Sequence, residues 1–178
     1  MKIVVVNGFG GSGKDTFENF VKDYGTARGY QIYKTSMVEF VKEEAEKLGW
    51  QGGKTLADRR FLSDLKDSLT KWNDSPFQAV KRTIQKCEDW NVDLLFIDAR
   101  EAEDIDRLKT ENSNITTLLV LRQEIGGRPF GNHADDGVLD YQYDWVIDNN
   151  GSLEDLSATA ETWFNEIIYE EKIIKLVD

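Results

Sequence analysis

Short runs of apolar residues recur along the chain, and longer stretches with helical spacing separate most of them. Four of these runs look like buried parallel strands and a fifth is weaker; they are residues 3–6, 30–33, 92–97, 115–121 and 144–147. Strands that alternate with helices form a doubly wound sheet, because each helix crosses back over the sheet to the next parallel strand. The pattern therefore predicts a three-layer α/β fold.

Local signals support several of the helices between these runs. Ser75 followed by Pro76 is typical of a helix start with serine as the N-cap, and residues 151–155 come close to a capping box. From residue 56 to residue 72 the apolar positions are spaced by three, four and three, which predicts one buried stripe on a helix; they are Leu62, Leu65, Leu69 and Trp72.

The stretch from residue 123 to residue 140 shows neither period, and four glycines punctuate it. A loop of this length is uncommon inside a compact domain unless it serves as a lid or binds a ligand. At 178 residues the chain has the length of one domain with a proper core. We therefore expect a single domain over residues 1–178 with a lid at 123–140.

The composition excludes several classes of function. A net charge of −11 and a pI near 4.6 disfavour a nucleic-acid polymer as partner, although a small anion can still bind where a few arginines converge. One cysteine, Cys87, permits no internal disulfide, and with a single histidine, His133, a zinc site of His and Cys is excluded in practice. The first apolar run is too short for a signal peptide and no run reaches the length of a membrane span, so we expect a cytoplasmic protein that does not enter the membrane.

The most informative motif follows the first apolar run directly. Gly8, Gly13 and Lys14 satisfy the pattern G-x-x-x-x-G-K between a predicted strand and a predicted helix. In such a loop the backbone N–H groups surround an anion, the helix dipole adds positive potential, and the lysine reaches the β- and γ-phosphates of a nucleoside triphosphate. The predicted nucleotide-binding residues here are Gly8, Gly10, Gly11, Ser12, Gly13, Lys14, Asp15 and Thr16.

The position after Lys14 departs from the usual serine or threonine, whose hydroxyl normally ligates Mg²⁺. Asp15 stands there instead, so the metal would be held by Asp15 directly, by Asp15 through water, or by Thr16. Asp98, which follows the third strand, is a further candidate metal ligand. The predicted metal residues are therefore Asp15, Thr16 and Asp98.

The same glycines permit a second interpretation, because Gly8, Gly10 and Gly13 also spell the G-x-G-x-x-G of a dinucleotide site. Lys14 argues against it. A dinucleotide site also needs an acidic residue at the end of the second strand to bind the ribose, and residues 31–36 end without one. We therefore favour the triphosphate loop.

Polar residues that follow the strands are candidates to bind a phosphate acceptor, because ligands of an open α/β sheet lie beyond the carboxyl ends of its strands. Each also has a purely structural alternative. Ser36 and Asp98 could cap the helices that follow them, and Arg100 could pair with Glu103 or Asp104. Arg59 and Lys66 share a flank of the predicted stripe, with Arg60 on the opposite side. The predicted acceptor-binding residues are Ser36, Arg59, Lys66, Asp98 and Arg100.

Two arginines near the predicted lid are candidates to neutralise charge on the transferred group. Arg122 ends the fourth strand and Arg128 lies within the glycine-rich loop. With Lys14 they form the predicted catalytic set, since arginines in this role speed phosphoryl transfer strongly. His133 in the same loop is interpreted as a surface residue.

Four segments together resemble P-loop nucleoside and nucleotide kinases, and within them the group of phage-type deoxynucleoside monophosphate kinases and animal-type phosphomevalonate kinase. They are residues 12–16 (SGKDT), 98–100 (DAR), 120–122 (VLR) and 144–151 (DWVIDNNG). The resemblance implies ATP with Mg²⁺ as the donor complex and Arg100 as an acceptor ligand. It also implies that Asn149 and Gly151 lie near the adenine, although a helix cap at Ser152 explains the same residues.

Motif and resemblance together favour a kinase that transfers the γ-phosphoryl group of ATP to a nucleoside monophosphate, deoxynucleotides included. A kinase for another phosphorylated acceptor, such as phosphomevalonate, has the same motifs. A third hypothesis is a regulatory protein that binds a nucleotide without transferring phosphate, although the guanine-reading motif Asn-Lys-x-Asp is absent. The expected partners are small nucleotides, and the acceptor and the oligomeric state stay open.

Overall fold

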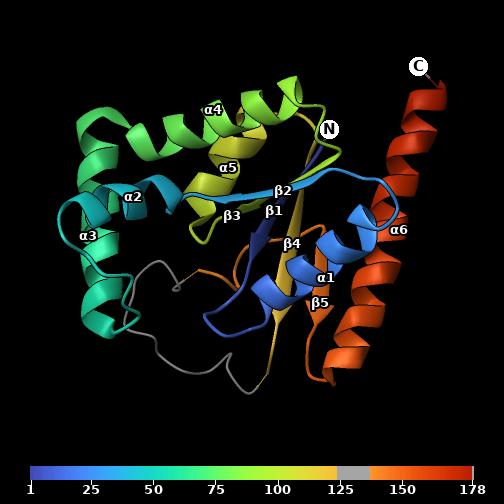
Figure 1. The fold of residues 1–178 in the computed structure, drawn as a ribbon, viewed down its shortest axis with the longest axis horizontal. Helices are drawn as coiled ribbons and strands as arrows, with labels where there is room; N and C mark the ends of the chain where they lie inside the picture. The colour runs from blue at the N-terminus through green and yellow to red at the C-terminus, as the bar shows by residue number, and fades with distance from the viewer. Residues whose placement is uncertain (124–136, 178) are drawn as a thin grey trace.

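A computed structural model of the chain describes residues 1–123 and 137–177. Strands and helices alternate through most of it (Figure 1). In chain order the elements are β1 (Lys2–Asn7), α1 (Lys14–Thr26), β2 (Ile32–Ser36), α2 (Glu39–Lys47), α3 (Leu56–Asn73), α4 (Ser75–Asp89), β3 (Leu94–Asp98), α5 (Ala102–Glu111), β4 (Ile115–Leu121), β5 (Trp145–Asp148) and α6 (Leu153–Val177).

The five strands form one parallel sheet in the order β2-β3-β1-β4-β5. The register aligns Asp98 with Val6 on one side and with Ser36 on the other, so the ends of three strands lie level. The α/β fold with a parallel sheet and helices on both faces is therefore confirmed. Its strand order reverses at β1, and the loop after β1 lies at the crevice where such folds bind ligands.

Each face of the sheet has its own core, because alternate residues of a strand point to opposite faces. Val4 and Val6 pack under α1 and α6, where the ring of Trp163 stacks on Phe96 at 5.9 Å between centroids. Ile3 and Val5 pack under α4 and α5 on the other face. Burial on both faces explains why the central strands are continuous apolar runs.

The second strand runs from Ile32 to Ser36, so the predicted bounds of 30–33 were wrong. The residues that pair with β3 include Lys34, Thr35 and Ser36, whose polar side chains do not look like a buried strand. They are tolerated because β2 is an edge strand and has a neighbour on one side only. The other strands start or end within two residues of their predicted bounds.

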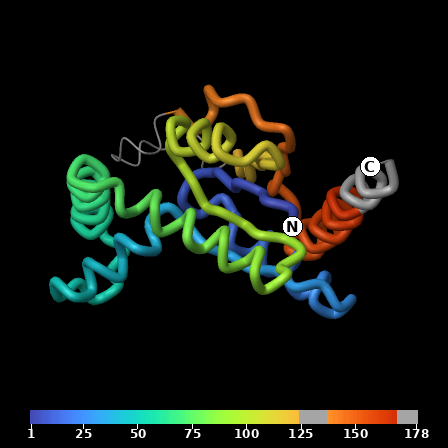
Figure 2. The backbone as a smooth tube through the Cα atoms, turned by 90° about the horizontal axis from the view of Figure 1, so that it is seen from above, coloured from blue at the N-terminus to red at the C-terminus, as the bar shows by residue number. Residues whose placement is uncertain are grey.

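The predicted buried stripe on α3 was also wrong. Trp72 is 84% exposed, and Leu62, Leu65 and Leu69 are only half-buried, whereas the buried residue of the helix is Lys66. The reason is the position of α3, whose main packing partners are α2 and α4 rather than the sheet. Figures 1 and 2 place α3 on the opposite side of the molecule from α6.

Helix starts were predicted with mixed success. Ser152 and Asp155 form the expected capping box, since the amide of each donates to the side chain of the other. Ser75 is the first residue of α4 rather than its cap, which is Asp74 in a left-handed conformation. Ser36 does not cap α2 either, because the cap of that helix is Val38.

Part of the predicted lid is described by the structure. Residues 137–140 form a turn, and Val138 is buried against Phe9 and Leu119. Residues 124–136 lie outside the described residues, so Arg128 and His133 stay predictions. Within the described part of the chain, no helix is both long and apolar enough to span a membrane.

Candidate active site

The loop between β1 and α1 has the backbone that its glycines predict. Gly13 has a φ of 96°, and a Cβ at that position would lie 2.2 Å from Nδ2 of Asn149. Asn149 donates from this amide to the carbonyl of Ser12 at 2.8 Å. Any residue other than glycine would therefore be strained at position 13 and would push away the side chain that supports the loop.

Lys14 is the first residue of α1, and its side chain folds over the loop. Its Nζ atom donates to the carbonyl of Gly8 at 3.1 Å. Burial lowers the pKa of Lys14, an effect that Asp98 opposes. The lysine thus lies where its charge can reach an anion held by the loop.

Asn7 supports the base of the loop and was missed by the sequence analysis. Its Oδ1 accepts from the amide of Gly8 at 2.7 Å, and its Nδ2 donates to the carbonyl of Arg100 at 3.0 Å and to the hydroxyl of Tyr143 at 2.7 Å. The hydroxyl of Tyr143 in turn donates to the carbonyl of Val138 at 2.9 Å. The sequence did contain a signal for this role, because Asn7 is a polar residue between the first apolar run and the glycines of the loop. Asn7 therefore links the loop, the segment after β3 and, through Tyr143, the end of the predicted lid.

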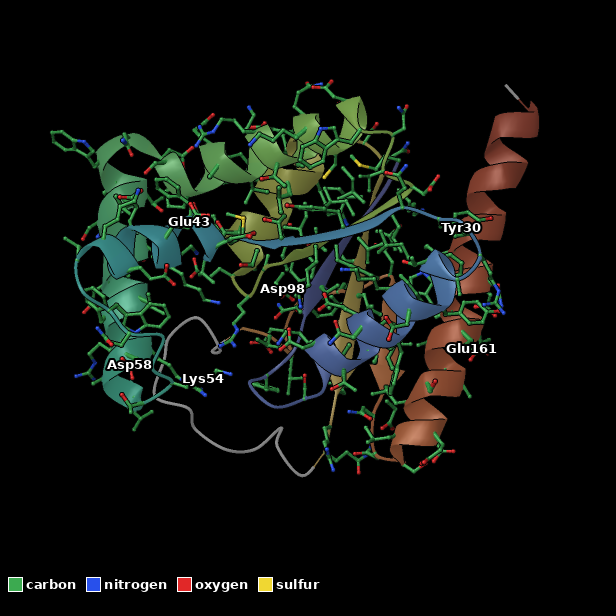
Figure 3. The ribbon with its side chains drawn as sticks, viewed as in Figure 1. Tyr30, Glu43, Lys54, Asp58, Asp98 and Glu161 are labelled. Carbon is green, nitrogen blue, oxygen red and sulfur yellow. The ribbon has the colours of Figure 1, made fainter. Side chains whose placement is uncertain are left out.

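Three carboxylates from two elements meet beside the first turn of α1. Ligand oxygens of Asp15, Glu18 and Asp98 all lie within 4.8 Å of one another. Asp15 and Glu18 are three residues apart on the helix and so share a face, while Asp98 comes from the end of β3. Figure 3 shows Asp98 at this end of the sheet, near the start of α1, with Tyr30 on the far side of the molecule.

Asp98 and Asp15 were predicted as metal residues, and the structure brings them together, but Glu18 was missed. Glu18 is 2% exposed. The sequence does not indicate this burial, because a glutamate inside a helix is usually on its exposed face. Burial raises its pKa to about 8, and Asp98 adds to the rise. The alternative that Asp98 caps α5 was wrong, because the cap of that helix is Glu101.

A fourth residue, Lys34 of β2, lies within this group of carboxylates. Its Nζ donates to Oδ1 of Asp15 at 2.5 Å, bonds to Oε2 of Glu18, and lies 3.2 Å from Oδ2 of Asp98. Burial by itself lowers the pKa of Lys34, but the carboxylates outweigh it and hold that pKa above its ordinary value. Sequence analysis did not select Lys34, although it directly follows the predicted strand, because it has no local feature that distinguishes it from a surface lysine.

The carboxylates fit Mg²⁺, which prefers hard oxygen ligands and binds proteins through one or two carboxylates in phosphoryl-transfer sites. Glu18 Oε1 and Asp98 Oδ1 are buried and have no hydrogen-bond partner among the described residues. A bound cation would be coordinated by these two oxygens. The coordination of the metal by Thr16 stays a prediction.

Two arginines of the predicted acceptor set converge on the phosphate loop. A Cβ placed on Gly10 would lie 3.3 Å from Nη1 of Arg59 and 4.0 Å from Nη2 of Arg100. They come from α3 and from the residues after β3, which approach the loop from one side. Arg60, expected to face solvent, is exposed.

Lys66 lies behind these arginines in an ion-pair network of its own. Its Nζ is 2.7 Å from Glu101 and 2.6 Å from Asp104, and its side chain is only 8% exposed. Burial lowers the pKa of Lys66, but Asp104 and Glu101 outweigh it and raise that pKa. Beside the network is a cavity of about 490 Å³, whose lining includes Lys66, Arg100, Arg107 and Gly137.

The remaining predicted residues lie along the same edge of the sheet. Ser36 ends β2, level with Asp98. Arg122 follows β4, at whose end the amide of Asn149 donates to the carbonyl of Leu121 at 2.7 Å. Gly151 precedes the capping box of α6. Contact of these residues with a nucleotide stays a prediction.

Comparison with solved structures supports the fold. The chain is similar to shikimate kinase from Aquifex aeolicus, with 12% identity and a TM-score of 0.50 over 96% of this chain and 98% of that one. It is similar to the protein APE1195, with 12% identity and a TM-score of 0.54 over 94% and 96%. A sugar kinase from Janibacter sp. matches with 22% identity and a TM-score of 0.49 over 93% and 95%. No family model matches the sequence, and a search of curated proteins also finds no match. The chain therefore shares its α/β fold with shikimate kinase and APE1195.

Proposed function

We propose that this protein is an ATP-dependent kinase of a small molecule, namely a nucleoside monophosphate or its deoxy form. The observation that carries the proposal is a convergence at one edge of the sheet. A glycine loop with Lys14, a group of carboxylates around Asp98, and the guanidinium groups of Arg59 and Arg100 all lie there. Phosphoryl transfer needs this combination of an anion cradle, metal ligands and cations.

On the donor side, the amides of residues 10–14 would hold the β-phosphate of ATP, and Lys14 would reach towards the γ-phosphate. Asp98 and Asp15 would hold Mg²⁺, which neutralises charge on the phosphates when it is bound. Asn149 supports the loop through the Ser12 carbonyl, which keeps the amides in place. Arg122 and Arg128 would approach the transferred group from the lid.

On the acceptor side, Arg59 and Arg100 would bind an anionic group next to Gly10. Guanidinium groups suit a phosphate because they donate paired hydrogen bonds in a plane. Their position beside the loop would bring the acceptor close to the γ-phosphate, and the cavity of about 490 Å³ beside Arg100 offers room for the rest of the molecule. These two charges favour an acceptor that carries a phosphate.

The experiment is ADP release, measured with ATP-Mg²⁺ against a panel of ribo- and deoxynucleoside monophosphates with phosphomevalonate beside them. Lys14→Met removes the loop charge, and Lys22→Met, on the exposed face of the same helix, is the matched control. We expect one or a few monophosphates to stimulate release in the wild type and in Lys22→Met, with the stimulation lost in Lys14→Met. Stimulation by phosphomevalonate alone would support the kinase proposal and show that the acceptor is not a nucleotide.

The competing hypothesis of a regulatory nucleotide-binding protein predicts a different result. It requires ATP binding that depends on Lys14, with no acceptor stimulating ADP release. Isothermal titration with a non-hydrolysable ATP analogue measures that binding separately. Binding without turnover across the whole panel would overturn the kinase proposal.

A further inference from the structure

The group of Asp15, Glu18 and Asp98 offers more negative charge than the lysine inside it can balance. Lys34 supplies one positive charge, and its Nζ donates to Asp15 and Glu18 and forms an ion pair with Asp98. When all three are ionised, the carboxylates carry three negative charges, and together they offer six oxygens. Lys34 therefore leaves both charge and ligand oxygens unmatched.

Glu18 contributes a buried oxygen that a cation could bind. It is 2% exposed, and its second oxygen, Oε1, is buried without a hydrogen-bond partner among the described residues. Asp98 Oδ1 is in the same condition. A buried carboxylate oxygen without a partner is unfavourable, so in native proteins an ion, a water or another ligand usually takes it.

The partial exposure of Lys34 makes an exchange feasible. Its side chain is 32% exposed and belongs to an edge strand, so its ammonium can swing into solvent without breaking the sheet. A divalent cation in its place would match the three carboxylates better in charge and could take the two unpartnered oxygens.

We infer that Glu18, Asp98 and Asp15 form a binding site for a divalent cation such as Mg²⁺ or Mn²⁺, which the ammonium of Lys34 fills when no such cation is bound. The inference adds Glu18 as a ligand and Lys34 as the competing charge. It rests on the proposed function for the cation's role, but it also requires that the cation bind in the absence of nucleotide.

The test uses Mn²⁺ as the probe and the full chain without nucleotide, with bound Mn²⁺ measured by electron paramagnetic resonance. Removing the competitor in Lys34→Met should strengthen Mn²⁺ binding at least about tenfold, because a positive charge at this distance repels a cation strongly at low dielectric. Lys22→Met, on the exposed face of α1, should leave the affinity unchanged. Affinity in Lys34→Met no higher than in Lys22→Met would overturn the inference.

A second variant tests the ligand. Adding Glu18→Gln to Lys34→Met should weaken Mn²⁺ binding at least about tenfold, because a neutral amide replaces a charged ligand. Glu46→Gln, which changes an exposed glutamate of α2, is the matched control. Equal affinity in the two double variants would mean that the carboxylates form only an ion-pair network.

The wild type provides a readout that does not depend on how well the variants fold. With ¹³C at the lysine ε-carbons, Mg²⁺ should shift the signal of Lys34, which Lys34→Arg identifies by its loss. The signal of Lys47, which pairs with Glu44 on the exposed surface, is the internal reference. A Lys34 signal that does not move would overturn the inference.

These results separate the inference from the kinase proposal. Mn²⁺ binding without acceptor-dependent ADP release would support the cation site and overturn the kinase. Acceptor-dependent ADP release without Mn²⁺ binding to the nucleotide-free protein would support the kinase and overturn the cation site.

Discussion

Lys34 and Lys66 both lie among carboxylates near the phosphate loop, but their surroundings differ. Lys66 is 8% exposed and pairs with Glu101 and Asp104, at 2.7 and 2.6 Å. Lys34 is 32% exposed and faces three carboxylates. Unpartnered buried carboxylate oxygens occur, among the described residues, only in the group around Lys34.

The difference separates a structural ion pair from a site that can accept a ligand. Lys66 holds α3 to the start of α5 and has little freedom to leave, because solvent scarcely reaches it. Lys34 has solvent access and leaves ligand oxygens unused. The number of carboxylate oxygens and charges left without a partner therefore indicates a ligand site better than the presence of an ion pair does.

The largest expected effect compares the two lysines directly. Lys66→Met should lower the free energy of unfolding by about 3 kcal/mol, because it leaves Asp104 buried without its cation. Millimolar MgCl₂ should not restore this loss, whereas it should restore most of the loss in Lys34→Met, where a cation can replace the ammonium. Urea unfolding with and without MgCl₂ measures both. Equal recovery of the two variants would contradict the distinction.

The next effect concerns Arg100, which lies between the two groups. If it binds the acceptor, Arg100→Gln should raise the acceptor KM by about 50-fold, the loss of a charged hydrogen-bonding pair, with little change in the KM for ATP. Steady-state ADP release gives both constants, and Arg82→Gln on the exposed face of α4 is the control. An equal rise in both KM values would place Arg100 on the donor side instead.

A smaller effect comes from a more exposed pair, which provides a baseline for both lysines. Arg107 donates to Oδ1 and Oδ2 of Asp74 at 3.0 and 2.7 Å and holds the pKa of that carboxyl below its ordinary value. Asp74→Asn should cost about 1 kcal/mol of unfolding free energy near pH 7.

The sign of the pH dependence follows from the lowered pKa of Asp74. The stabilisation is present above the ordinary aspartate pKa of about 3.9, and it is lost as the pH falls through the lower pKa of the folded state. Urea unfolding of wild type and Asp74→Asn from neutral to acidic pH should therefore show the difference shrinking as the pH falls. A difference that grows on acidification would contradict this account.

The smallest effect is expected at Trp72, on the same helix as Lys66. Trp72→Ala should change the unfolding free energy by no more than about 0.5 kcal/mol, since the side chain is 84% exposed. Thermal and urea unfolding measure it. A loss of several kcal/mol would contradict this expectation and support the buried stripe that the apolar spacing of α3 predicted.

Most features that depend on neighbours in sequence were predicted well, although the bounds of β2 and the cap of α4 were not. The apolar runs other than 30–33, the capping box at Ser152 and the glycine loop with Lys14 are local patterns, and the structure contains each of them. Asp98 was selected for the same reason, because a polar residue at the end of a buried strand lies at the ligand edge of a parallel sheet.

Only the tertiary structure decided which distant polar residues meet. Glu18 and Lys34 come together because α1 packs beside the edge strand β2, and neither residue differs locally from an ordinary surface charge. Lys66 is buried and Trp72 exposed because α3 packs against α2 and α4 rather than the sheet. Periodicity predicts that a helix has an apolar face, but the packing of the whole chain determines which face is covered and which charges that burial pairs.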